Sequence, residues 1–274
     1  MPPRNFTDAE EAQIAAIYQS GHSAKSIMRA YGLRFHISIV DALRRQGVTQ
    51  RAAPERNRLY ALDAHAFDVI DNEAAAYWWG FLYADGCVMR RTLIVGLAIK
   101  DTGQVEALRD FMKSTSRIVH QVKLGYCDNH TVSFTDRHLA VRMRDLGIVT
   151  HRPHSDRVWN NLPPEMIHHW VRGFFDGDGS ARKAPSMVFC GKPELLTWLR
   201  AEFAAQAGTN PALAVTKHRT ANLSYLYVSG LHQALKIARY MYNDATVYLP
   251  RKKAVIDGWP APQVPEYKLK WRTP

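Results

Sequence analysis

The chain has 274 residues, of which 36 are Lys or Arg and 25 are Asp or Glu, so its formal net charge is +11 and its pI is near 9.7. A hydrophobic content of 46% supports a folded core, and a basic globular protein of this kind is typical of one that meets nucleic acid. The apolar stretches fall short of the roughly 20 residues of a membrane span, so we expect a cytoplasmic protein with no membrane segment. The three cysteines lack paired spacing and so indicate neither a disulfide framework nor a zinc site.

A small helical domain is predicted for residues 1–51. Thr7 and Glu10 form a capping box before a first helix, a second short helix follows, and residues 35–46 form a third after a glycine turn. This order describes a helix-turn-helix, whose third helix would read the major groove of DNA. Its candidate DNA-binding residues are His36, Ser38, Arg44 and Arg45. A helical bundle with a solvated charged face is the alternative, because periodicity alone does not separate the two.

A basic linker is predicted over residues 52–70. Arg51, just before it, and Arg56 within it are expected to follow a phosphate backbone between two contact sites. A solvated tether that makes no contact with DNA is the alternative.

A nine-residue phrase occurs twice in the rest of the chain, at residues 78–86 and 171–179. Aligned without gaps, the copies share four pairs of residues: Gly80 and Gly173, Phe81 and Phe174, Asp85 and Asp178, and Gly86 and Gly179. A repeat this long indicates two similar half-domains. Helix-start signals precede both copies, so residues 71–83 and 163–175 are each predicted to form a helix that ends in the phrase.

The paired glycines need a reason, because a glycine inside an apolar helix costs about 1 kcal/mol relative to alanine. We expect Gly80 and Gly173 to let two parallel helices approach closely. Asp85 and Asp178 would then arrive together at the negative ends of two helix dipoles, where they repel unless a cation joins them. Hard oxygen ligands favour Mg2+ in such a place. The alternative is that each Asp-Gly merely stops a helix and starts a turn.

The doubled phrase resembles the signature of the LAGLIDADG homing endonucleases in their single-chain, two-motif form, and the resemblance covers roughly residues 71–258. It implies a hydrolase that cuts both strands of double-stranded DNA at a long site, acts as a monomer, leaves short 3′ overhangs and takes part in intron mobility. The metal ligands would be Asp85, Asp178 and the carbonyl groups of Ala84 and Gly177. They would hold Mg2+ or Mn2+, whereas Ca2+ would support binding without cleavage.

The two copies match the rest of the family's pattern unequally. The family places a lysine near the metal in each half, and Lys252 matches it in the second half, where it would polarise water or stabilise the charged transition state. In the first half His154 stands there instead, which would mean unequal cleavage of the two strands, a water network organised by Arg152 and His154, or an alignment that is shifted by one residue. Asp176 matches an earlier acid of the signature, where the first copy has Tyr83. That position is not a metal ligand in the family.

The segments after each phrase repeat the order hairpin, helix, hairpin, helix. They predict an α+β protein with two αββαββα halves, residues 71–162 and 163–258, and a basic tail over 259–274. The resemblance implies that the halves are pseudo-symmetric and that their four-stranded antiparallel sheets form a saddle on DNA. The candidate DNA contacts on strands and turns are Arg90, Arg91, Lys100, His120, Lys123, Arg182, Lys183, Lys217, His218 and Arg219. Strand alternation would turn about half of them towards DNA.

Two other functions are open for the same scaffold. A non-catalytic DNA-binding transcriptional regulator would need no acids, so the presence of both Asp85 and Asp178 speaks against it. An intron maturase that binds RNA is also open, although a helix-turn-helix favours duplex DNA because the deep groove of RNA does not readily admit such a helix.

Overall fold

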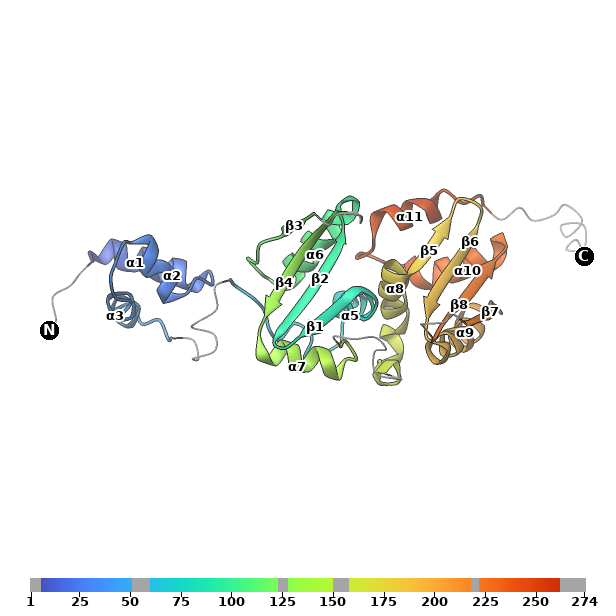
Figure 1. The fold of residues 1–274 in the computed structure, drawn as a ribbon, viewed down its shortest axis with the longest axis horizontal. Coiled ribbons are helices and arrows are strands. Elements are labelled where there is room, and N and C mark those ends of the chain that lie inside the picture. The colour runs from blue at the N-terminus through green and yellow to red at the C-terminus, as the bar shows by residue number, and fades with distance from the viewer. Residues whose placement is uncertain (1–5, 51–59, 123–127, 150–157, 218–221, 262–274) are drawn as a thin grey trace, which may run out of the picture. The chain divides into compact units, whose positions relative to one another are not determined.

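The computed structural model describes residues 6–50, 60–122, 128–149, 158–217 and 222–261. The predicted α+β class is confirmed, since helices accompany two four-stranded antiparallel sheets (Figure 1). The chain divides into two compact units, one of Met1–Asp68 and Val88–Arg142 and one of Val69–Cys87 and Met143–Pro274. The helix of the first motif therefore belongs to the same unit as the helix of the second. Among the described residues, no helix is both long and apolar enough to cross a membrane.

Three short helices form the N-terminal part: α1 (Asp8–Gln19), α2 (Ala24–Ala30) and α3 (Ile37–Arg45). The predicted capping box is confirmed, because the amide of Thr7 donates to Oε2 of Glu10 at 2.8 Å and the amide of Glu10 donates to Oγ1 of Thr7 at 3.3 Å. A small core joins the helices and contains Ile14, Tyr18, Ile27, Ile39 and Leu43. Helices this short are marginal alone, so burial of these side chains stabilises them.

Both halves have the predicted αββαββα order. The first contains α5 (Glu73–Asp85), β1 (Gly86–Met89), β2 (Thr92–Ala98), α6 (Thr102–Phe111), β3 (Val119–Gln121), β4 (Asn129–Thr135) and α7 (Arg137–Asp145). The second contains α8 (Ile167–Asp178), β5 (Gly179–Arg182), β6 (Ser186–Gly191), α9 (Pro193–Ala207), β7 (Ala212–Lys217), β8 (Asn222–Ser229) and α10 (Leu231–Tyr242), after which comes α11 (Pro250–Asp257). The strand orders are β1-β2-β4-β3 and β5-β6-β8-β7, so corresponding strands occupy corresponding places.

Each sheet has one buried apolar face and one open face. The buried face of the first sheet, against which α6 packs, is formed by Leu93, Val95, Val132 and Phe134. The buried face of the second sheet, against which α9 and α10 pack, is formed by Met187, Phe189, Leu226 and Val228. Because successive side chains in a strand point to opposite faces, the residues between these belong to the open faces.

Both motif helices continue beyond their predicted ends. The sequence predicted ends at Tyr83 and Phe175, but α5 ends at Asp85 and α8 at Asp178. The amide of the next glycine still donates to a carbonyl one turn back, and that glycine has a negative φ instead of the left-handed conformation that commonly stops a helix. Each Asp is therefore the last residue of a helix that passes directly into a strand.

Helix α11 is absent from the predicted elements. Pro250 occupies its first turn, where the missing amide hydrogen costs nothing. The buried side chains of this helix are Lys252 and Ile256. A stripe of apolar residues is the signal that periodicity detects, and a buried lysine does not provide it.

Candidate functional site

Helices α5 and α8 pack backbone against backbone at Gly80 and Gly173. A Cβ atom on Gly80 would overlap the carbonyl oxygen of Trp170, and a Cβ atom on Gly173 would overlap that of Tyr77. The two contacts are reciprocal, since Tyr77 and Trp170 each stand three residues before a motif glycine. Only glycine, which has no Cβ atom, permits so close an approach.

The C-terminal ends of the same helices also come together. A Cβ atom on Gly177 would overlap the Cβ atom of Ala84 and would lie 3.2 Å from Oδ2 of Asp85. The carboxylate of Asp85 therefore lies beside the last turn of α8, whose final residue is Asp178. Both aspartates are half-buried. The structure thus brings together the four residues predicted as metal ligands.

The side chain of Lys252, on α11, caps the C-terminal end of α8. Its Nζ donates to the carbonyl oxygens of Phe175 at 2.7 Å, Asp176 at 2.7 Å, Gly179 at 2.6 Å and, at a longer 3.4 Å, Gly177. Burial lowers the pKa of Lys252 to about 8, and the negative charges of Asp176, Asp85 and Asp178 oppose that shift. One ammonium group is therefore within electrostatic reach of both motif carboxylates and of the negative end of α8.

Asp176 holds this end of α8 against three other segments. Its buried carboxylate accepts hydrogen bonds from the Tyr77 hydroxyl at 2.9 Å, the Tyr242 hydroxyl at 2.8 Å and the Leu249 amide at 2.7 Å. Burial raises the pKa of Asp176, while the charge of Lys252 and these hydrogen bonds lower it. Because Leu249 precedes α11 directly, Asp176 positions the helix that carries Lys252.

Arg172 and Glu73 join the beginning of α5 to α8. The guanidinium of Arg172 has no exposed surface, and its Nη2 lies 2.5 Å from Oε1 of Glu73. It also donates to the carbonyls of Met241 at 2.6 Å and Val247 at 2.9 Å. Burial alone would raise the pKa of Glu73, but hydrogen bonds from residues 246 and 247 and the charge of Arg172 lower it overall. These contacts fix the beginning of α5 against the middle of α8.

The first copy of the motif has aromatic side chains where the second has these polar groups. In the gapless alignment Trp79 corresponds to Arg172 and Tyr83 to Asp176. The indole of Trp79 donates to the carbonyl of Leu146 at 2.9 Å. The ring of Tyr83 lies with its centroid 5.4 Å from that of Trp170. The buried polar network thus belongs to the second copy.

Sequence reasoning missed Asp176, Arg172 and Glu73 as structural groups. A signal for two of them exists, because Arg172 and Asp176 are four residues apart and so share one face of a helix that is otherwise apolar from residue 170 to residue 175. A charged pair on such a face indicates buried partners. Glu73 gives no such signal, since an acid in the first turn of a helix is ordinary.

The basic residues predicted as DNA contacts lie in several different environments. Arg90 and Arg91 are exposed in the β1–β2 turn, Lys100 is exposed before α6, and Arg182 and Lys183 are exposed at the end of β5. Lys217 ends β7, and nothing further is described of its side chain. Lys123, His154, His218, Arg219, Arg51 and Arg56 lie outside the described residues.

His120 belongs to the helix-covered side of its sheet. It pairs with His130, which is in register with the buried residue Leu97, and the hydroxyl of Thr102 at the start of α6 lies 2.6 Å from Nδ1 of His130. Nε2 of His120 lies 3.2 Å from the carboxylate of Asp128. Strand register therefore places His120 on the face opposite to the open one.

The open face of the second sheet carries aromatic residues that sequence reasoning did not select. Tyr225 and Tyr227 lie on it together with Val188, since β8 alternates them with Ser224, Leu226 and Val228, all buried. Tyr227 is 38% exposed, and its ring centroid lies 6.1 Å from that of Tyr225. The alternation of tyrosine with buried residues was the available signal.

The third helix of the N-terminal part separates its two arginines. Arg44 is 74% exposed and pairs with Asp41 at 3.2 Å on the same helix. Arg45 instead pairs at 2.6 Å with Glu11 of α1, whose side chain is 1% exposed. His36 is exposed at the start of α3 and Ser38 is half-buried. Arg45 thus joins α1 to α3, and Arg44 is the arginine that faces solvent.

No protein-family model and no curated protein matches the chain. Among solved structures, I-DmoI in complex with DNA and Ca is 13% identical, with 72% of this chain and 100% of that chain covered at a TM-score of 0.48. Full-length DUF199/WhiA from Thermatoga maritima is 12% identical, with coverages of 76% and 69% and a TM-score of 0.45. The I-LtrWI LAGLIDADG homing endonuclease bound to target DNA is 10% identical, with coverages of 68% and 89% and a TM-score of 0.45.

Proposed function

We propose that this chain is a site-specific endonuclease that cuts both strands of DNA with the help of a divalent metal ion. The observation that carries the proposal is the gathering of Asp85 and Asp178 at one end of the α5–α8 pair. Two carboxylates there repel each other and would repel a DNA phosphate, so in a protein that only binds DNA they would lower the affinity. A bound cation reverses both effects.

The donor set fits a hard divalent ion. The carboxylates of Asp85 and Asp178 and the backbone carbonyls of Ala84 and Gly177 offer oxygen atoms, which favour Mg2+ or Mn2+. When bound, such an ion activates a water molecule and stabilises the leaving oxygen of the phosphodiester. Ca2+ is larger and takes more flexible geometries, so we expect it to support binding without cleavage.

Lys252 acts in this proposal as a positioning residue. An ammonium group has three N–H donors, and four backbone carbonyls, those of Phe175, Asp176, Gly179 and, at a longer distance, Gly177, already engage all of them. We therefore infer that Lys252 holds the end of α8, and with it Asp178, instead of donating to the attacking water. For the first half we propose that His154 takes the place of this lysine, and that the two strands are cleaved unequally as a consequence.

DNA binding is proposed for the two open sheet faces and for the N-terminal helices of a monomer. The exposed groups Arg90, Arg91, Lys100, Arg182 and Lys183 would contact phosphates. We propose domain limits at residues 1–51, 52–70, 71–162, 163–258 and 259–274. The first of these is a helix-turn-helix that lengthens the recognised site, and the two halves form a saddle.

Replacing each arginine of α3 by glutamine separates the two roles. Arg44→Gln should weaken DNA affinity and reduce the slope of log affinity against log salt by about 1, because one phosphate contact is lost. Arg45→Gln should instead lower the stability of the N-terminal helices, because the buried carboxylate of Glu11 loses its ion pair with Arg45. Fluorescence anisotropy at several salt concentrations and thermal unfolding measure the two effects. The assignment is wrong if both variants change affinity alone.

A non-catalytic DNA-binding regulator is the second candidate, and one observation favours it. Lys252 already supplies positive charge at the end of α8 and donates to the carbonyl of Gly177, one of the proposed metal ligands. In a regulator this ammonium would take the place of a metal ion. The two candidates then differ in whether a divalent ion is needed at all.

A two-step assay distinguishes the candidates. Binding selection from a random-sequence DNA library in Ca2+ recovers the recognised site, and the same DNA is then incubated with the protein in Mg2+. An endonuclease cuts both strands within the selected site, and chelation of the ion stops cleavage. A regulator selects the same kind of site with or without a divalent ion and leaves the DNA intact.

A further inference from the structure

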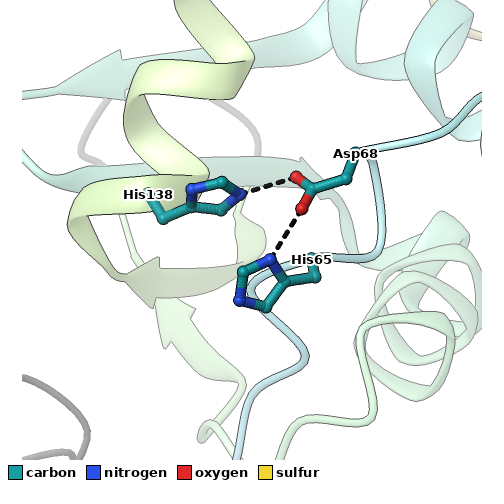
Figure 2. A group of neighbouring side chains, drawn as sticks. All are labelled: His65, Asp68 and His138. Carbon is teal, nitrogen blue, oxygen red and sulfur yellow. Dashed lines mark hydrogen bonds and ion pairs between the residues drawn. The ribbon is translucent and has the colours of Figure 1, made fainter. Parts of the chain in front are cut away.

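Two imidazoles and one carboxylate meet on the surface of the first unit, apart from the motif acids. Figure 2 shows the rings of His65 and His138 directed towards the carboxylate of Asp68. Nδ1 of His65 lies 2.6 Å from one carboxylate oxygen, and Nε2 of His138 lies 2.6 Å from the other. One ligand atom from each residue lies within 4.8 Å of the others. We propose that His65, Asp68 and His138 form a Zn2+ site.

The chemistry of the three groups suits this ion. Neutral imidazole nitrogen and carboxylate oxygen are both ordinary Zn2+ ligands, at about 2.0–2.2 Å from the metal. In a tetrahedral site two such ligand atoms lie roughly 3.3 Å apart, so each of the two histidine–carboxylate pairs must separate by less than about 1 Å from its present 2.6 Å. Three protein ligands leave a fourth position for water or for a group from a partner.

The backbone around Asp68 is already held in place. The amide of His65 donates to Oδ1 of Asp63 at 3.1 Å, and the amide of Asp68 donates to the carbonyl of His65 at 3.0 Å. Arg142, one turn beyond His138 on α7, donates to the carbonyl of Phe67 at 2.8 Å. The ring of Phe67 is fully buried. The metal would therefore enter a site whose ligands need little ordering, which favours binding.

The local charge also favours a cation. The hydrogen bond to Asp68 raises the pKa of His65, and the charges of Asp63 and Asp136 act in the same direction. Arg142 is the cation on the neighbouring helix, but its described bonds go to backbone carbonyls of Phe67 and Asp68 and leave the carboxylate to the two imidazoles. Since Zn2+ displaces a proton from His65, its affinity should rise with pH.

A second group of similar composition provides a contrast. His168, His169 and Asp244 also offer ligand atoms within 4.8 Å of one another. There, however, the guanidinium of Arg172 lies 3.1 Å from Nδ1 of His169. A permanent cation bonded directly to a ligand ring opposes a divalent ion. His168 is therefore a matched control for a histidine in a cluster that should not bind.

Zn2+ bound at His65, Asp68 and His138 would tie the segment that precedes α5 to α7. That segment leads upstream to the N-terminal helices and downstream to the first motif. The site would therefore stabilise the packing of residues 65–68 against α7. This role is independent of the oxygen ligands proposed for Mg2+.

Isothermal titration calorimetry of the full-length protein with Zn2+ tests the proposal. Wild type and His168→Ala should each bind one equivalent of Zn2+ at this site. His65→Ala and His138→Ala should lose that equivalent or bind it more than about tenfold more weakly. The affinity of that equivalent should increase from about pH 6 to about pH 8. Co2+ in place of Zn2+ should give the absorption of a low-coordinate complex in wild type and lose it in His65→Ala.

Two further results bear on the same test. Excess Mg2+ should leave the Zn2+ signal unchanged, because imidazole ligands are poorly suited to Mg2+. Since His65 is 65% exposed, its replacement leaves the fold intact and circular dichroism can verify this. The proposal would be overturned if wild type, His65→Ala and His138→Ala bound Zn2+ equally. Loss of the tightly bound equivalent in His168→Ala alone would also overturn it.

Discussion

Asp85→Asn and Asp178→Asn are each expected to reduce DNA cleavage roughly a thousandfold or more while affinity for the site is kept. In the proposed endonuclease the neutral amide removes charge from the metal site, whereas DNA binding depends on basic groups elsewhere on the protein. Affinity should be kept, because the neutral amide also removes a group that repels the DNA phosphate when no metal ion is bound. Single-turnover cleavage in Mg2+ and binding in Ca2+ measure the two quantities separately.

Asp257→Asn is the matched control for these variants. Asp257 ends α11 in the same unit and pairs with Lys253 at 2.6 Å, with its side chain 57% exposed. Its loss removes the same charge far along the helix from Lys252 and should leave the cleavage rate unchanged. Cleavage of both strands at a normal rate by Asp85→Asn or Asp178→Asn would remove the metal assignment and return support to the regulator.

Gly173→Ala and Gly80→Ala are expected to abolish the native packing of α5 against α8. Each new methyl group would overlap a backbone carbonyl oxygen on the facing helix, and the backbone cannot rotate away as a side chain can. Overpacking in a core costs about 1–3 kcal/mol where neighbours can adjust, and here they cannot, so the loss should exceed that range. Urea denaturation of each variant measures the change in the free energy of unfolding.

Gly103→Ala shows what the same substitution does without a facing helix. Gly103 lies in the first turn of α6 and is exposed, and a Cβ atom there would meet nothing within 4 Å. Because alanine is the better helix former by up to about 1 kcal/mol, this variant should be as stable as wild type or more stable. Equal losses at residues 103 and 173 would contradict the backbone contact.

The repeated phrase explains why the architecture could be predicted. Two copies 93 residues apart, each followed by alternating and helical patterns, determine the order αββαββα twice, and local patterns suffice for that. What a local pattern lacks is the identity of a distant partner. Arg45 and Arg44 are neighbours in sequence, yet only the fold brings Glu11 to one of them. The face on which His120 lies similarly depends on strand register with His130, which the sequence does not state.

The candidate site shows the same division. Asp85 and Asp178 could be selected because they occupy the same position in the two copies of the repeat. Asp176 occurs in one copy only, and its three hydrogen-bond donors come from three separate segments. Lys252 could be found through the family's pattern. Its bonds to the end of α8 could not be predicted, because they depend on α11, a helix with almost no apolar periodicity in its sequence. Burial of polar groups depends on tertiary partners that sequence periodicity does not reveal.

The exchange of Trp79 for Arg172 across the repeat has a consequence for how the chain can assemble. A duplication begins with two interchangeable halves, either of which could pair with a copy of itself. Here an α8 helix facing a second α8 would bury two guanidinium groups with no Glu73 between them, and an α5 helix facing a second α5 would lack Arg172 for its glutamate. Burying an unpartnered charge costs several kcal/mol. The Arg172–Glu73 pair therefore favours packing of α5 against α8 over packing of either helix against a copy of itself.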